Sequence, residues 1–121
     1  MDSGRLYTHE YSADAGTLTV RLNGEIDHHS ASVLRRDLDQ LICSHRPKKL
    51  LLDLSAVDFM DSSGLGLIMG RYTLLDSFGG ETVLLNPTDR IRKILDLAGF
   101  GRICRVEVVK RSKGKEGKEN G

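Results

Sequence analysis

Apolar and polar residues alternate with two different periods along this chain. Residues 17–23 carry apolar side chains at every second position, which is typical of a half-buried β-strand. Residues 6–11 precede them as an expected edge strand, and residues 14–16 between the two have turn composition. The pattern predicts an antiparallel hairpin, and we expect its second strand to end at Gly24.

A different pattern, with apolar residues three and four positions apart, follows a short apolar run. Residues 50–54 form this run, which predicts a buried strand. The next element is predicted as a helix over residues 62–77, terminated by Gly79 and Gly80, which suit a left-handed exit. Its expected buried face consists of Leu65, Ile68, Met69, Tyr72 and Leu75.

One further helix is predicted before this central unit. We expect it to begin with Ser30 as its N-cap and to close at residues 45–47. Its apolar face is expected to contain Ala31, Leu34, Leu38, Leu41 and Ile42, whereas Arg35, Arg36, Asp37 and Asp39 are expected to face solvent.

The remaining elements complete an alternation of strands and helices. Residues 82–85 predict a short strand, and the next helix is expected to start with Asn86 as its N-cap and to stop at Gly99. Residues 103–108 predict a last strand. Strands that alternate with helices form parallel crossovers, so we predict the α/β fold class, with an antiparallel pair at the N-terminal edge.

Composition limits the organisation and the function classes. The 121 residues are 39% hydrophobic and 29% charged, with a formal net charge of +1, which predicts one globular domain over residues 1–109 and gives no reason to expect a nucleic acid partner. Residues 110–121 contain no large apolar side chain, and we predict a disordered basic tail there. The basic residues of this tail are Lys110, Arg111, Lys113, Lys115 and Lys118.

Location, metals and cofactors are addressed by a few further features. No stretch approaches the ~20 apolar residues of a membrane span, and no signal-peptide pattern opens the chain, so we expect a cytoplasmic protein. Cys43 and Cys104 lie in no C-x-x-C pattern and predict reduced thiols. Asp27, His28 and His29 are adjacent and cannot easily converge on one ion, so we expect no metal and no cofactor.

An acid, two hydroxyls and a glycine separate the buried strand from the central helix. Asp61 is the expected N-cap, because its carboxylate can accept a hydrogen bond from a free amide of the first turn. Ser62 then opens the helix near the positive end of its dipole, where an added phosphate of about −1.5 to −2 charge is tolerated. A serine at a helix start is more often only a cap or a solvated hydroxyl, so both interpretations stand.

The glycines of the central helix also require an explanation. Gly64, Gly66 and Gly70 each cost up to ~1 kcal/mol in a helix interior relative to alanine. Two explanations stay open: tight internal packing, or a smooth surface that a partner's backbone approaches closely.

Residues 59–72 closely resemble the phosphorylation-site segment of bacterial anti-sigma factor antagonists, the STAS-domain family. A second segment, residues 24–29, matches the sporulation branch of that family at its expected place, and the resemblance spans roughly residues 6–109. It implies a STAS-type single domain, with a mixed sheet of four to five strands and helices packed mainly on one face. It also implies that Ser62, and not Ser63, is the phosphoacceptor.

The resemblance implies a regulatory binding protein that is not an enzyme. Its unphosphorylated form would bind a nucleotide-bound anti-sigma factor, itself a serine kinase, and thereby release a sporulation sigma factor. Phosphorylation of Ser62 would switch binding off, a PP2C-type phosphatase would reverse it, and the free protein is expected to be a monomer. The expected partner-binding residues are Asp27, His28, Asp61, Ser63, Gly64, Leu65 and Gly66. For His28, a polar loop without a role stays open.

Three alternatives compete with this function. Within the same class, a general-stress antagonist is the nearest rival. A nucleotide-binding module is disfavoured because Gly70 lies one position too far from Gly64 and Gly66 for G-x-G-x-x-G. A serine hydrolase that uses Ser62 or Ser63 is disfavoured because the nucleophile elbow G-x-S-x-G is absent.

Overall fold

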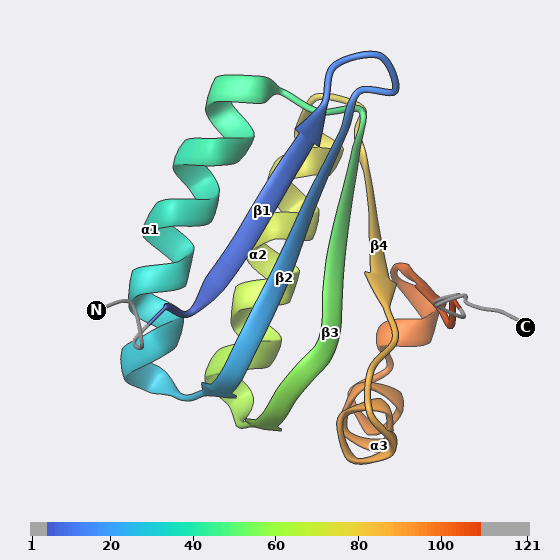
Figure 1. The fold of residues 1–121 in the computed structure, drawn as a ribbon. Helices are drawn as coiled ribbons and strands as arrows, with labels where there is room; N and C mark the ends of the chain where they lie inside the picture. Colours follow the sequence, from blue (N-terminus) through green and yellow to red (C-terminus); the bar gives the residue numbers. More distant parts are fainter. Residues whose placement is uncertain (1–4, 110–121) are drawn as a thin grey trace, which may run out of the picture.

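The strands pair into one mixed sheet. The structure is a computed structural model that describes residues 5–109, and in that part of the chain five strands lie in the order β1-β2-β3-β4-β5 (Figure 1). Their bounds are β1 (Tyr7–Ser12), β2 (Thr17–Ile26), β3 (Lys49–Met60), β4 (Glu81–Leu85) and β5 (Arg105–Glu107). β1 and β2 are antiparallel and the other neighbours are parallel, so the predicted mixed sheet with its N-terminal hairpin is confirmed.

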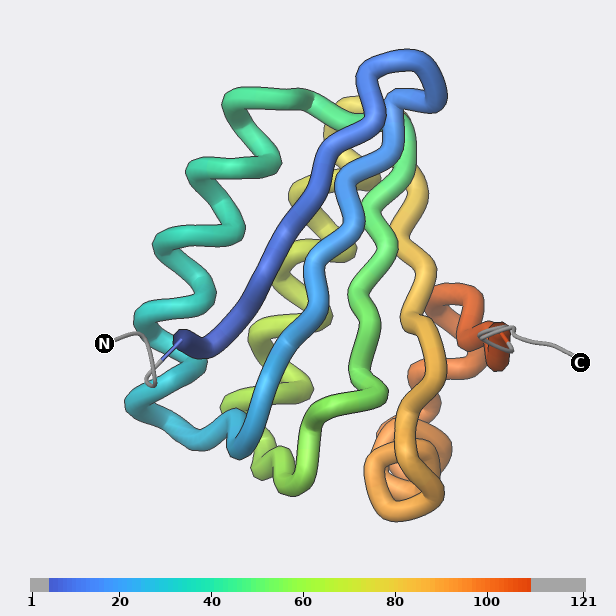
Figure 2. Tube along the Cα trace, viewed as in Figure 1, coloured from blue at the N-terminus to red at the C-terminus, as the bar shows by residue number. Residues whose placement is uncertain are grey.

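Helices connect the parallel strands. They are α1 (His28–His45), α2 (Ser62–Ser77) and α3 (Asp89–Leu97), and a short 3-10 helix, η2 (Phe100–Arg102), precedes β5. Figures 1 and 2 show α1 and α2 side by side behind the sheet, with α3 near the C-terminal end of β4. Right-handed crossovers between neighbouring parallel strands place their helices on the same face. The expected arrangement, with helices mainly on one face of the sheet, is confirmed.

The alternating pattern of the strands fills the space between sheet and helices. The even-numbered apolar residues of residues 17–23 are fully buried, and the apolar run of residues 50–54 contributes three more buried leucines. Each helix adds buried side chains to the same cluster, for example Leu38 from α1, Ile68 from α2 and Leu95 from α3. The core is therefore mainly aliphatic and holds the strand ends firmly against the helix starts.

The prediction that β2 ends at Gly24 is wrong. The strand continues to Ile26, although its pairing with β3 shifts register on both sides of Gly24. Gly24 has a φ of 77°, a left-handed conformation that glycine adopts without a steric penalty, and such residues are typical of β-bulges. Because of this bulge, the strand continues beyond Gly24, which the sequence pattern had indicated as its end.

Two predicted N-caps are also wrong. Asp27 caps α1, whereas Ser30 lies in the first turn and completes a capping box with it. Thr88 caps α3 by accepting a hydrogen bond from the Ile91 amide. Asn86 instead adopts a left-handed conformation, and its side-chain oxygen accepts a hydrogen bond from the Val109 amide at 2.7 Å. Both helices had two good capping residues within three positions, and the pattern alone did not choose between them.

The central helix has the predicted bounds, and Gly79 leaves it in a left-handed conformation, as predicted. The predicted buried face is only partly right, because Leu65, Met69 and Tyr72 are half-buried. The buried stripe consists of Gly64, Leu67, Ile68, Arg71 and Leu75. A helix that is apolar on most sides gives periodicity little contrast, so the facing could not be read from the pattern.

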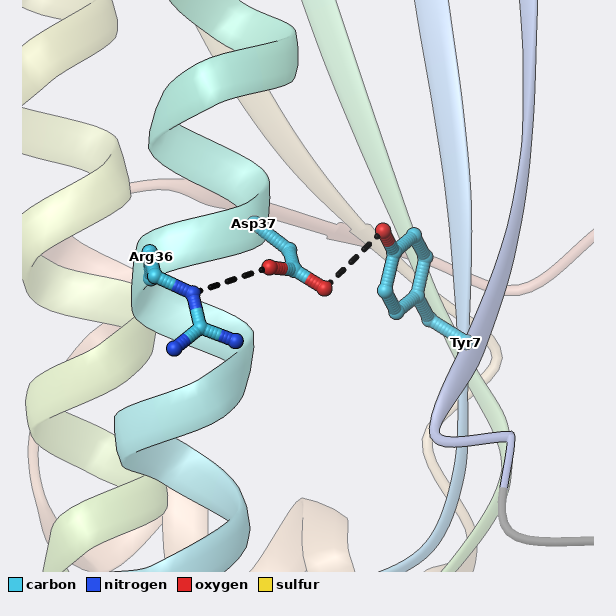
Figure 3. A network of polar contacts seen from close by, with 3 residues as sticks. All are labelled: Tyr7, Arg36 and Asp37. Carbon is cyan, nitrogen blue, oxygen red and sulfur yellow. Dashed lines mark hydrogen bonds and ion pairs between the residues drawn. The ribbon is translucent and has the colours of Figure 1, made fainter.

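Two acids of α1 that were expected to face solvent instead contact neighbouring elements. Asp37 accepts a hydrogen bond from the Tyr7 hydroxyl of β1 at 3.2 Å and contacts the adjacent Arg36 (Figure 3). Asp39 forms an ion pair with the buried Arg71 of α2 at 2.9 Å. These contacts fix α1 between the hairpin and the central helix. The predicted disordered tail, residues 110–121, lies outside the described residues.

Candidate functional site

The carboxyl ends of β2 and β3 lie level with each other. Ile26 and Met60, the last residues of these parallel strands, are paired in register. The next residues are Asp27 and Asp61, and the Asp61 amide donates a hydrogen bond to the Ile26 carbonyl at 3.3 Å. Because each aspartate caps the helix that follows, α1 and α2 begin side by side at one edge of the sheet. This edge is the usual binding location in α/β sheets.

A closed hydrogen-bond network fixes the start of α1. The Asp27 carboxylate accepts a hydrogen bond from the Ser30 amide at 3.0 Å, and the Ser30 hydroxyl oxygen accepts one from the Asp27 amide at 2.9 Å. The Ser30 hydroxyl also lies 2.9 Å from the Glu25 carbonyl, to which it can donate. The backbone hydrogen bond from Ser30 lowers the pKa of Asp27 below its ordinary value. The exposed Asp27 carboxylate is thus held ionised in a fixed position.

The start of α2 is built in the same way but carries the two serines. The Asp61 carboxylate accepts a hydrogen bond from the Ser63 amide at 2.8 Å, which confirms the predicted N-cap. Ser62 is the first helical residue, and its side chain is exposed, whereas Ser63 is half-buried. Within residues 5–109 the Ser62 hydroxyl makes no hydrogen bond. It is therefore accessible to a modifying enzyme without disruption of the cap.

The glycines of α2 differ in what surrounds them. A Cβ at Gly64 would collide with the Met60 side chain and come within 3.3 Å of Ile26, so this glycine serves internal packing. A Cβ at Gly66 or Gly70 would meet nothing within 4 Å. Gly64 is accordingly buried and faces the core, and Gly66 leaves open space at the surface.

A shallow groove of about 320 Å³ runs between the first turns of α1 and α2. It is lined by His28, Ala31, Ser32, Arg35, Ser63, Gly66 and Leu67. The structure thus brings three of the predicted partner-binding residues, His28, Ser63 and Gly66, into one surface. His28 belongs to the first turn of α1, whereas the expected helix start at Ser30 placed it in a loop.

The sequence interpretation missed Ser32 and Arg35 as members of this site. A signal was present, because His28, Ser32 and Arg35 are spaced by four and three positions and therefore share one side of a helix. The wrong N-cap concealed it, since a helix that starts at Ser30 leaves His28 outside. Leu65 and Ser62 do not line the groove. Leu65 is half-buried and precedes the groove residue Gly66, and Ser62 is the first residue of α2.

Two further features of the described residues bear on other functions. Residues 5–109 contain no group of three or more His, Cys, Asp or Glu side chains placed to hold a metal ion. Among the helices of the same part of the chain, none is long and apolar enough to cross a membrane.

Comparison with known proteins identifies the class to which this fold and edge belong. Residues 10–112 match the STAS domain family, and the chain belongs to that family. The resemblance drawn from residues 59–72 and 24–29 is thereby confirmed at the family level.

Several individual relatives are named anti-sigma factor antagonists. The anti-sigma F factor antagonist of Paenibacillus polymyxa is 40% identical over 91 residues, 75% of this chain and 78% of that protein. The anti-sigma-B factor antagonist of Bacillus subtilis is 33% identical over 97 residues, 80% of this chain and 85% of that protein. The solved structure of the Bacillus cell fate determinant SpoIIAA in its phosphorylated form matches with a TM-score of 0.69 at 30% identity, covering 88% of this chain and 94% of that one.

Proposed function

We propose that this protein is an anti-sigma factor antagonist that binds an anti-sigma factor through the edge where α1 and α2 begin. The observation that carries the proposal is the placement of Ser62, exposed and without a hydrogen bond in the described part of the chain, directly after the Asp61 cap. The names of the relatives and the match to a phosphorylated SpoIIAA structure support the same interpretation. Unphosphorylated Ser62 permits binding, and phosphorylation of Ser62 prevents it.

The physical basis of the switch is local charge. A phosphoryl group adds about −1.5 to −2 charge beside the Asp61 carboxylate and on the same edge as Asp27. A partner that covers this edge would have to desolvate that charge or face repulsion from its own acids. Losing one well-placed buried contact in an interface can cost about 2 kcal/mol or more, which lowers affinity more than tenfold.

Apolar surface next to the serine supports a protein partner. Phe59 is 40% exposed, one of the large apolar side chains of the described residues that the fold leaves uncovered. It lies three positions before Ser62 and pairs with Glu25 of β2. Gly66 lets a partner that covers Ser62 approach α2 closely. Gly64 contributes indirectly, by seating the first turn of α2 against Met60.

The kind of anti-sigma factor is the finer part of the proposal. We assign this chain to the sporulation branch, with a nucleotide-bound serine kinase as partner and a PP2C-type phosphatase that removes the phosphate. The higher identity to an anti-sigma F factor antagonist favours this branch over the general-stress branch, which the anti-sigma-B relative represents as the second candidate.

The test combines mass spectrometry with a binding assay. The protein is incubated with Mg-ATP and a candidate anti-sigma factor kinase, and intact mass and peptide mapping locate any phosphoryl group. We expect one group, on Ser62, and loss of the complex. Ser62→Ala should bind the partner without accepting phosphate, and Ser63→Ala is the matched control that should still be phosphorylated.

Two outcomes would contradict the proposal in different ways. Phosphate on Ser63 in the Ser62→Ala variant would show that the acceptor is misassigned. No complex and no phosphate, with a kinase that is active on another antagonist, would show that this edge serves a different partner.

A further inference from the structure

The groove between α1 and α2 carries cationic groups and no acid. Among its lining residues, His28 and Arg35 can carry positive charge, and no Asp or Glu side chain is present. Neither helix has an acidic residue in its first turn. Asp27 and Asp61 cap the two helix starts, so the negative charges of this edge lie at the caps and not among the residues that line the groove.

Arg35 is exposed, and its charge is not paired with an acid of the described residues. Within residues 5–109 it forms no ion pair, whereas the nearby Asp39 is already paired with Arg71 at 2.9 Å. An acidic group in the groove would supply the partner that Arg35 lacks among the described residues.

We propose that the groove is a docking site for an acidic side chain, Asp or Glu, of the anti-sigma factor, with Arg35 as its main partner. The inference rests on the proposed function. His28 and Ser63 supply further donors on the two walls, and Gly66 leaves the floor open, since a Cβ there would meet nothing within 4 Å. A carboxylate is the chemistry that these donors recognise best, because Arg binds it through two parallel hydrogen bonds.

This site links the groove to the serine next to it. Ser63 lines the groove and Ser62 is the preceding residue, so a phosphoryl group on Ser62 places its negative charge beside the docked carboxylate. The two negative charges would repel each other, and the phosphate would compete with the docked carboxylate for Arg35. Phosphorylation would then act on a particular contact as well as on the general charge of the edge.

The experiment compares two adjacent arginines of one helix. Arg35 lines the groove, whereas Arg36 is 73% exposed on another side of α1 and contacts Asp37 (Figure 3). Full-length Arg35→Ala and Arg36→Ala proteins are titrated by calorimetry with the nucleotide-bound anti-sigma factor at several salt concentrations. We expect Arg35→Ala to raise Kd about tenfold and to flatten its salt dependence, and Arg36→Ala to change Kd less than about twofold.

Conservative and compensating variants complete the test. Arg35→Lys should recover most of the affinity, because it keeps the charge. Binding of Arg35→Glu should be restored by changing one surface acid of the anti-sigma factor to Arg. An unchanged Kd for Arg35→Ala, or equal losses for Arg35→Ala and Arg36→Ala, would overturn the proposed docking site. If the unmodified protein did not bind the anti-sigma factor at all, the proposed function would be contradicted. The docking site would then also lose its proposed ligand.

Discussion

Gly64 and Gly66 lie two positions apart in α2 and have opposite surroundings. We expect Gly64→Ala to lower the free energy of unfolding by about 1–3 kcal/mol, because the new methyl group collides with Met60 in a packed core. Gly66→Ala should raise it by up to about 1 kcal/mol, since alanine favours the helix and nothing is displaced. Urea denaturation of both variants measures the difference. Equal effects would show that Met60 can move aside.

The Asp27 cap gives the protein an acid-sensitive contact. Its pKa is lowered in the folded state, so its contribution to stability is complete above the unfolded value of about 4 and is lost as the pH falls through the folded value. An asparagine at this position would keep a capping oxygen but could not titrate. We expect Asp27→Asn to lose less stability than the unmodified protein between about pH 5 and pH 2.5, measured by urea midpoints. Parallel curves would contradict this.

Single residues also show where sequence reasoning succeeds and where it fails. Asp61 was correctly predicted as a cap because it directly precedes the helical periodicity that follows the buried strand. Asp27 was not, because Ser30 three positions later is an equally good capping residue. The two residues form one capping box, and only the geometry shows which of them opens the helix.

At the scale of elements, an ion pair joins α1 and α2, the two helices that border the groove. It pairs the buried Arg71 with Asp39, which is 41% exposed. Removing only the acid leaves a buried cation without its partner, whereas replacing the cation by an apolar side chain does not.

We therefore expect Asp39→Ala to destabilise the protein by about 1–3 kcal/mol and Arg71→Met by less, even though each removes the same ion pair. Thermal and urea unfolding of both variants provide the measurement. If Arg71→Met were the more damaging change, the guanidinium would have a structural role beyond this pair.

The pairing of Arg71 with Asp39 was beyond the reach of the sequence pattern. The periodicity of α1 placed Asp39 in solvent. Arg71 was not predicted to be buried, because only apolar residues were assigned to the buried face of α2. The strand at residues 17–23 and the end of α2 near Gly79 were more accessible, because alternation and the glycine exit are local signals. Contacts between elements depend on which face each helix buries, and α2 offered little contrast to decide that.

At the scale of the whole molecule, Ser62 lies outside the core that stabilises the fold. We expect Ser62→Asp to change the free energy of unfolding by less than about 0.5 kcal/mol, because the side chain is exposed and a negative charge suits a helix start. The same variant should bind the anti-sigma factor more than about tenfold more weakly. Calorimetric binding and urea unfolding of one preparation separate the two effects. A large loss of stability would show that the switch acts by unfolding.

The family and the general edge of the sheet were readable from two short motifs, whereas the groove was not. Residues 24–29 and 59–72 follow neighbouring parallel strands, so their meeting at one edge follows from topology. The groove depends on the side-by-side arrangement of two helices, which a one-dimensional pattern does not give. Its members Ser32 and Arg35 can be recognised only when α1 is known to begin at His28.

The level ends of β2 and β3 have a consequence for how such proteins can diverge. Apart from Leu67, the residues of α1 and α2 that line the groove are not among those that these helices bury in the core. Changes at Ser32 or Arg35 can therefore alter which partner is accepted without a loss of folding. Duplicated copies in one cell could in this way become insulated from each other's signals through a few surface substitutions.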